Sequence, residues 1–105
     1  MTDRELLELA AKAAGLKTWP EGYTDLTGVA VIGDDGMPSH HWHPLDSDGA
    51  AFRLAIFLRM DIAITPTTAY VLDDEGREYD EPLGTDATAA TRRAIVRAAA
   101  AIGDA

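Results

Sequence analysis

The sequence predicts an α+β fold in which helices pack on an antiparallel sheet, with the element order α-β-β-α-β-β(-β)-α. Three segments place apolar residues at helical spacing behind good N-cap residues. Two tight turns rich in Asp and Gly lie between short apolar runs that read as strands. With 105 residues, 47% of them apolar, the chain has the size and composition of a single domain over residues 1–105.

A first helix is predicted over residues 3–14. Thr2 and Glu5 have the spacing of a capping box, in which each side chain accepts a hydrogen bond from the other's backbone N–H. Apolar residues then recur at helical intervals until Gly15, which favours the end of the helix.

A first hairpin follows a connector over residues 16–28. Residues 29–32 read as a strand, and residues 39–43 as its partner. Between them, Gly33–Gly36 has the Asp and Gly composition of a tight turn.

The second helix is predicted over residues 48–60, with Asp46 or Ser47 as its N-cap. Its residues are apolar on almost every side. This pattern predicts that it is the most buried helix of the fold.

The rest of the chain predicts a strand, a second hairpin and a last helix. Residues 61–65 alternate like a strand, and residues 70–79 form a hairpin around the turn Asp73–Gly76. The last helix is predicted over residues 87–101, because nearly all of its residues are strong helix formers. Thr85 or Asp86 serves as its N-cap, and Gly103 ends it.

The acidic charge is concentrated in two segments. The chain has 18 acids and nine bases, for a formal charge of −9. Residues 18–52 hold six acids and no base, and residues 73–86 hold seven acids and one base. This balance argues against a general nucleic-acid binder and against docking on anionic membranes, because both need cationic surface.

Crowded acids in and beside the two turns would focus a negative field if the turns lie on one side. The functional interpretation is a surface that binds a basic protein, and the other interpretation is that turn-forming acids only keep the surface solvated. Asp73 and Asp74 are both expected to be exposed and ionised. The predicted partner-binding residues are Asp34, Asp35, Asp73, Asp74, Glu75, Glu78, Asp80 and Glu81.

His41 and His43 are the residues that look most like metal ligands. On a strand they point to the same face, and two imidazoles so placed can share a metal with a nearby carboxylate. A third ligand cannot be named from the sequence. The competing interpretation is a pair of structural histidines that flank an anchoring Trp42.

Motifs of catalysis and cofactor binding are missing from the sequence. It contains no cysteine, no P-loop, no dinucleotide fingerprint and no nucleophile elbow. Asp46–Gly49 is similar to the opening of a calcium loop, but Phe57 stands at the twelfth position, where that loop needs a glutamate. The sequence therefore predicts a protein that is not an enzyme and has neither a cofactor nor a metal site.

The N-terminus has mixed charge and no continuous apolar segment of the kind that targeting peptides carry. The densest apolar run, residues 50–60, is interrupted by Arg53 and Arg59 and is too short to span a bilayer. A soluble intracellular protein is therefore expected.

Two segments resemble small bacteriophage-encoded proteins of the ABA-sandwich type. Residues 42–55, WHPLDSDGAAFRLA, are similar to the family's W-x-P-L-x-D-D-G-x-A-x-R-L-A stretch, although His43 stands where the family often has Asn. Residues 90–100, ATRRAIVRAAA, are similar to its C-terminal helix. The resemblance implies a phage or prophage origin and an α+β sandwich, and it transfers no catalytic residue.

The leading hypothesis is a non-enzymatic acidic phage or prophage protein that binds a basic host protein in the cytoplasm of a bacterial cell, with inhibition of that protein as the expected consequence in an anti-CRISPR or other anti-defence role. By size, charge and implied origin it is similar to anti-CRISPR proteins, and a nucleic-acid-binding effector is one candidate partner. Two alternatives stay open. One is a small metal-binding or hydrolytic domain that uses His41 and His43, and the other is a virion or regulatory module that self-associates.

Overall fold

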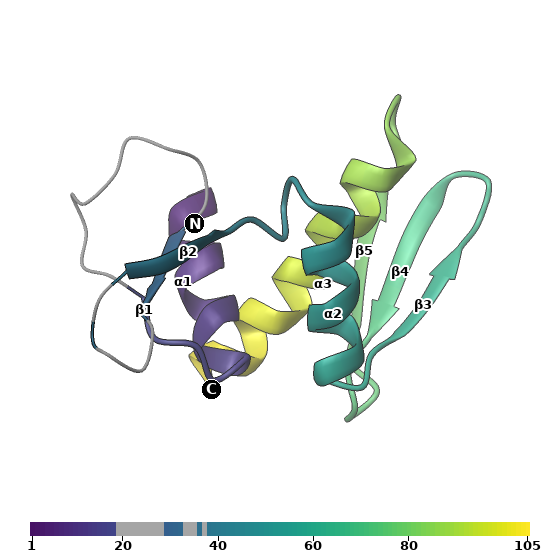
Figure 1. Ribbon diagram of the computed structural model, residues 1–105. Helices are drawn as coiled ribbons and strands as arrows, with labels where there is room; N and C mark the ends of the chain where they lie inside the picture. The colour runs from purple at the N-terminus through teal and green to yellow at the C-terminus, as the bar shows by residue number, and fades with distance from the viewer. Residues whose placement is uncertain (19–28, 33–35, 37) are drawn as a thin grey trace.

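The computed structural model describes residues 1–18, 29–32, 36 and 38–105, and it confirms the predicted α+β class and element order (Figure 1). The elements are α1 (Asp3–Ala13), β1 (Val29–Ile32), β2 (Pro38–Trp42), α2 (Asp48–Phe57), β3 (Asp61–Ile64), β4 (Thr68–Leu72), β5 (Glu78–Pro82) and α3 (Ala87–Asp104).

The strands form two separate antiparallel sheets. The first sheet pairs β1 with β2, and the second has the order β3-β4-β5. Figure 1 shows the two sheets at opposite ends of the molecule, with the helices between them. The predicted first hairpin is thus confirmed in its strands, whereas most of its turn, including Asp34 and Asp35, lies outside the described residues.

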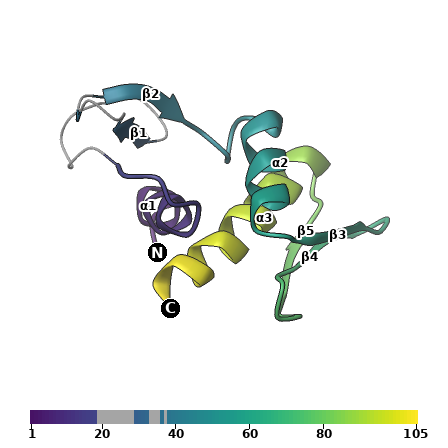
Figure 2. The same cartoon turned by 60° about the horizontal axis from the view of Figure 1, so that its bottom comes forward.

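The core is built around α3. This helix contacts α1, α2, β4 and β5, and eight of its residues are buried. Most of those eight are alanines, whose small side chains allow neighbouring elements to approach the helix closely. Figure 2 shows α2 and α3 together on one face of the second sheet, and none of the described helices lies on the opposite face.

The prediction that the second helix is the most buried one is wrong. Helix α2 buries Ala50, Ala51, Leu54 and Ala55, while Phe52, Ile56 and Phe57 expose 61%, 51% and 62% of their surface. The physical reason is that α2 packs mainly on α3, and a single neighbour covers only one side of a helix. An apolar sequence on all sides does not ensure that all sides find a partner.

The structure contains most of the predicted helix caps. Thr2 and Glu5 form the capping box of α1, with N–O distances of 3.1 and 3.2 Å. Gly15 follows that helix with a φ of +75°, which glycine adopts without strain. Of the paired alternatives, Ser47 caps α2 and Asp86 caps α3.

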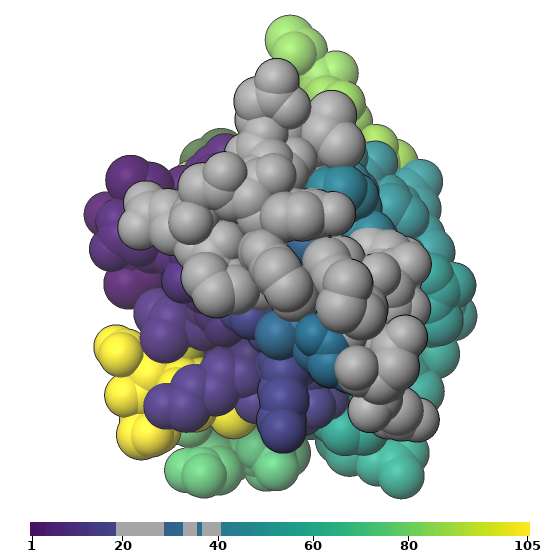
Figure 3. All heavy atoms as spheres, turned by 60° about the vertical axis from the view of Figure 1, so that its left-hand side comes forward, coloured from purple at the N-terminus to yellow at the C-terminus, as the bar shows by residue number. Residues whose placement is uncertain are grey.

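Gly103 has a different role from the one predicted, since α3 continues through it to Asp104. A Cβ at this position would overlap with the carbonyl oxygen of Leu9 in α1 and lie 2.8 Å from its carbonyl carbon. Glycine is therefore needed for the close approach of the two helices. Figure 3 shows α1 and the C-terminal end of α3 side by side at this end of the molecule.

Arg92 of α3 fixes the position of α2. Its guanidinium donates to the carbonyl oxygen of Leu45 and to the Asp48 carboxylate, both at 2.7 Å. The first contact lies just before α2 and the second in its first turn, where an acid is favoured by the helix dipole. Within the described part of the chain, no helix has both the length and the hydropathy that a membrane span requires.

Candidate functional site

The register of the second sheet decides which of its side chains face α3 and which face away. Ala69 and Val71 of β4 are fully buried on the side of α3. Because side chains alternate along a strand, Tyr70 and Leu72 point to the opposite side. This opposite side is called the outer face of the sheet.

Two rows of cross-strand neighbours make up the outer face. In one row Leu72 stands between Asp61 of β3 and Glu78 of β5. In the other row Tyr70 stands between Ala63 of β3 and Asp80 of β5. The two strands that border β4 thus bring acids to an apolar and aromatic centre.

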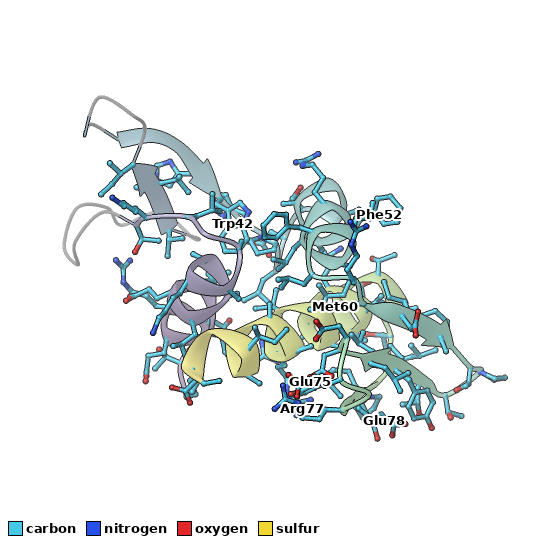
Figure 4. All side chains as sticks on the ribbon, turned by 90° about the horizontal axis from the view of Figure 1, so that it is seen from below. Trp42, Phe52, Met60, Glu75, Arg77 and Glu78 are labelled. Carbon is cyan, nitrogen blue, oxygen red and sulfur yellow. The ribbon has the colours of Figure 1, made fainter. Side chains whose placement is uncertain are left out.

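Glu78 and Asp80 are two positions apart on β5 and lie on the same face. The protonated carboxyl group of Glu78 can donate a hydrogen bond to the Asp80 carboxylate, and this bond, together with the repulsion between the two groups when both are ionised, raises the pKa of Glu78 above its ordinary value. The fold therefore holds two like charges together. Figure 4 shows Glu78 on the side of the sheet opposite to Phe52.

The expectation that Asp73 is exposed is wrong, because its side chain is fully buried in the turn between β4 and β5. One carboxylate oxygen accepts from the backbone N–H groups of Glu75 and Arg77, each at 2.9 Å. The other oxygen accepts from Arg77 Nε at 2.7 Å. Burial raises the pKa of Asp73, but these hydrogen bonds outweigh it and bring the pKa below the ordinary value. Asp73 is thus the residue that closes the turn.

Glu81 also differs in placement from its acidic neighbours. It lies on the inner side of β5 and forms an ion pair with Arg97 of α3. The same guanidinium donates to the backbone oxygen of Asp80 at 2.8 Å. Glu81 therefore serves to attach the sheet to the helix and does not belong to the outer face.

Asp74 and Glu75 are exposed at the tip of the turn that Asp73 closes. Glu75 has one distant ion pair, 3.8 Å from Arg77 Nη2, and Figure 4 shows these two side chains next to each other. The turn adjoins the end of the sheet where Asp61 and Glu78 lie. These exposed acids together are called the acidic face: Asp61, Asp74, Glu75, Glu78 and Asp80.

Most ion pairs between described residues involve acids outside the acidic face, and the exception is the long contact of 3.8 Å between Arg77 and Glu75. Asp3, Asp48 and Glu8, which lie outside the acidic face, each have an arginine partner at 2.7–3.0 Å. In the same part of the chain, Asp61 and Asp80 form no ion pair. Apart from the long contact between Glu75 and Arg77, the carboxylates of the acidic face have no ion pair with a described residue.

Asp61 and Tyr70 were not among the predicted site residues. Asp61 lies in a segment with a slightly positive charge, and only the pairing of β3 with β4 brings it beside Glu78. The alternation of Glu78, Tyr79 and Asp80 was a signal that could have separated the outer acids from Glu81.

The histidines lie in a separate hollow of about 400 Å³ between β2 and α2, far from the acidic face. The rings of His41 and His43 stack with centroids 5.7 Å apart, which agrees with the prediction that both point to one face. Trp42 packs against the core, as an anchoring residue does. Arg53 lines the same hollow, and its positive charge opposes binding of a metal cation there.

Across the described residues, no group of three or more His, Cys, Asp or Glu side chains is placed to hold a metal ion. Comparisons with protein families, curated proteins and solved structures found no match to this chain.

Proposed function

We propose that this chain is a non-enzymatic interaction protein that binds a basic surface of another protein through its acidic face. The observation that supports this most is the placement of Glu78 and Asp80 on the same face of β5, where neither carboxyl group has an ion pair with a described residue. Crowding of like charges costs free energy in the isolated chain. A lysine or arginine of a partner relieves this cost by forming charge-assisted hydrogen bonds.

The centre of the acidic face suits arginine in particular. Tyr70 is half-buried and lies directly beside Asp80 in the sheet. An aromatic ring next to a carboxylate can take the flat face of a guanidinium by cation–π contact while the carboxylate accepts its hydrogen bonds. Leu72 holds the corresponding place beside Glu78 and offers apolar contact to the stem of a long basic side chain.

The class of partner follows from the charge. Proteins that bind nucleic acids do so through cationic grooves, and an acidic sheet that occupies such a groove competes with the nucleic acid. The resemblance of residues 42–55 and 90–100 to phage proteins supports a host protein as the owner of the groove. An inhibitor of a host defence effector, with anti-CRISPR activity as one form, is the role that we propose.

A matched pair of charge variants tests this function. Glu78→Gln with Asp80→Asn removes two acids from the acidic face, and Asp46→Asn with Asp104→Asn removes two exposed acids elsewhere. Both double variants have the same net charge. Binding to an arginine-rich peptide is measured by calorimetry at low and high salt.

We expect the first double variant to weaken peptide binding by about tenfold or more, and the control by much less. Equal weakening in the two variants would show that the peptide senses only the net charge, and the acidic face would then not be a site. Circular dichroism confirms that both variants are folded.

A further inference from the structure

The side of the second sheet that faces α2 and α3, opposite to the outer face, carries an apolar surface that the proposed function does not use. It combines residues of α2 and β3 whose side chains are 39–61% exposed, and it continues into a groove of about 410 Å³ against α3. Single exposed apolar residues are ordinary, but a contiguous group of large ones marks an interaction surface. Phe52, Ile62 and Ile64 line this groove, and Ile56 lies one helical turn after Phe52 on the same side of α2; these four residues are called the apolar patch.

Beside the patch runs an edge strand. In the described part of the chain, β3 pairs with β4 on one side only. Thr65 N donates to Thr68 O at 2.9 Å, so Thr65 and Thr68 form a hydrogen-bonded pair at the end of the β3–β4 ladder. Hydrogen-bonded and non-hydrogen-bonded pairs alternate along an antiparallel ladder, and Ile62 and Ile64 therefore fall in non-hydrogen-bonded pairs with β4. The backbone N–H and C=O groups of Ile62 and Ile64 consequently point away from β4, toward the open edge. Edges of this kind pair readily with a further strand.

We propose that a second copy of this chain covers the apolar patch, with the two β3 strands paired antiparallel about a two-fold axis at Ala63. In this register Ile62 of one copy stands opposite Ile64 of the other, and the outward N–H and C=O groups of both residues are satisfied. The two copies then form one continuous sheet of six strands, with both α2 helices on the same side. The inference is independent of the proposed function.

The second copy is favoured as occupant because the edge is complementary to itself. Its sequence from 62 to 64 is Ile-Ala-Ile, which reads the same in both directions across the axis. Asp61 falls opposite Thr65 of the second copy, so no acid of one strand stands opposite an acid of the other. Asp61 is the member of the acidic face that lies on β3, and the other members lie on β5 or in the turn before it, farther from the axis.

The strength expected of this dimer follows from its size and its charge. Four large side chains and one short strand would bury about 600 Å² of surface per copy or less, which is at the lower end of the range for specific protein–protein interfaces. We therefore expect association in the micromolar range. Because each copy carries a charge of −9, added salt should strengthen the dimer by screening the repulsion between copies.

Cysteine substitution tests the register, since the chain has no cysteine of its own. On the two-fold axis the two Ala63 Cα atoms would be about 4.5 Å apart, as in a non-hydrogen-bonded antiparallel pair, and a disulfide can join them. Asp61 is exposed on the same strand and the same face, but its two copies would lie roughly 13 Å apart. Ala63→Cys and Asp61→Cys are oxidised mildly, and the disulfide-linked fraction is measured.

A second pair of variants tests the patch itself. Phe52 and Phe57 lie on the same helix with 61% and 62% exposure, but only Phe52 belongs to the patch. Light scattering over a range of concentrations gives the dimer dissociation constant of Phe52→Lys and of Phe57→Lys. We expect about a tenfold increase for Phe52→Lys and little change for Phe57→Lys.

The proposal predicts rapid linkage of Ala63→Cys and little linkage of Asp61→Cys. Equal linkage of both variants overturns the register. A chain that stays monomeric at every concentration and salt level, or that loses its dimer equally in both lysine variants, overturns the second copy as occupant of the patch.

Discussion

Asp73 and Asp74 are neighbours of the same residue type, and the fold gives them opposite roles. Asp73 is buried and accepts three hydrogen bonds within its own turn, whereas Asp74 is exposed at the tip. Turn propensity alone cannot separate them, because Asp is favoured at both positions. The difference comes from Arg77, whose backbone and side chain both reach Asp73.

We predict that Asp73→Asn lowers the midpoint of thermal unfolding at neutral pH, while Asp74→Asn leaves it nearly unchanged. The Asp73 carboxyl has a lowered pKa in the folded chain, so its contribution to stability is present above the unfolded pKa and is lost as the pH falls through the folded pKa. The difference between wild type and Asp73→Asn should therefore shrink below about pH 4. A constant difference down to strong acid would contradict this role.

Glu78 is expected to show the opposite pH dependence. Its pKa is raised by Asp80, so folding favours the protonated form and stability rises as the pH falls through the folded pKa. Glu78→Gln should accordingly raise the unfolding midpoint at neutral pH and have no effect in acid. Thermal scans across pH check this, with Asp74→Asn as the control, and a lowered midpoint for Glu78→Gln at neutral pH would refute it.

At the scale of elements, the close contact of α1 and α3 depends on the glycine near the end of α3. Gly103→Ala should lower the free energy of unfolding by about 1–3 kcal/mol, because the new Cβ overlaps with the backbone of Leu9. Gly49→Ala in α2 is the matched control, since its Cβ would meet only the mobile end of Arg53 at 3.3 Å.

Chemical denaturation of the two glycine variants measures these free energies. We expect Gly49→Ala to be neutral or to gain about 0.5 kcal/mol from its better helix propensity. A Gly103→Ala variant as stable as Gly49→Ala would show that the two helices can separate without cost.

Elements were predictable where the signal is local. The capping box at Thr2, the turn at Asp73–Gly76 and the alanine-rich helix all depend on residues close in sequence, and the structure contains each of them. The exposure of Phe52 was not predictable, because it depends on how many neighbours α2 has. Likewise, the segment charge indicated Glu78 and Asp80, but Asp61 joined the site only through the sheet register.

At the scale of the whole molecule, the second sheet has two chemically different sides. The acidic face lies on the outer side, and the apolar patch lies on the side of the helices. A dimer joined at β3 would carry two acidic faces on one continuous sheet, which would let it bind an extended basic surface at two places.

The two surfaces should respond to salt in opposite directions. Rising salt should weaken the binding of a basic partner, which depends on attraction, and should strengthen self-association, which is opposed by repulsion. Calorimetry with an arginine-rich peptide and light scattering of the chain alone give the two dissociation constants. If both constants move in the same direction, one of the two surfaces has been assigned the wrong chemistry.

The most direct test of the acidic face is an NMR titration of the chain with an arginine-rich peptide. Our account predicts saturable shifts in the backbone amides of Asp61, Tyr70, Glu78 and Asp80, with little change around His41 and Phe52. Shifts that gather at the histidine hollow or the apolar patch, or that spread evenly over all exposed acids, would contradict it.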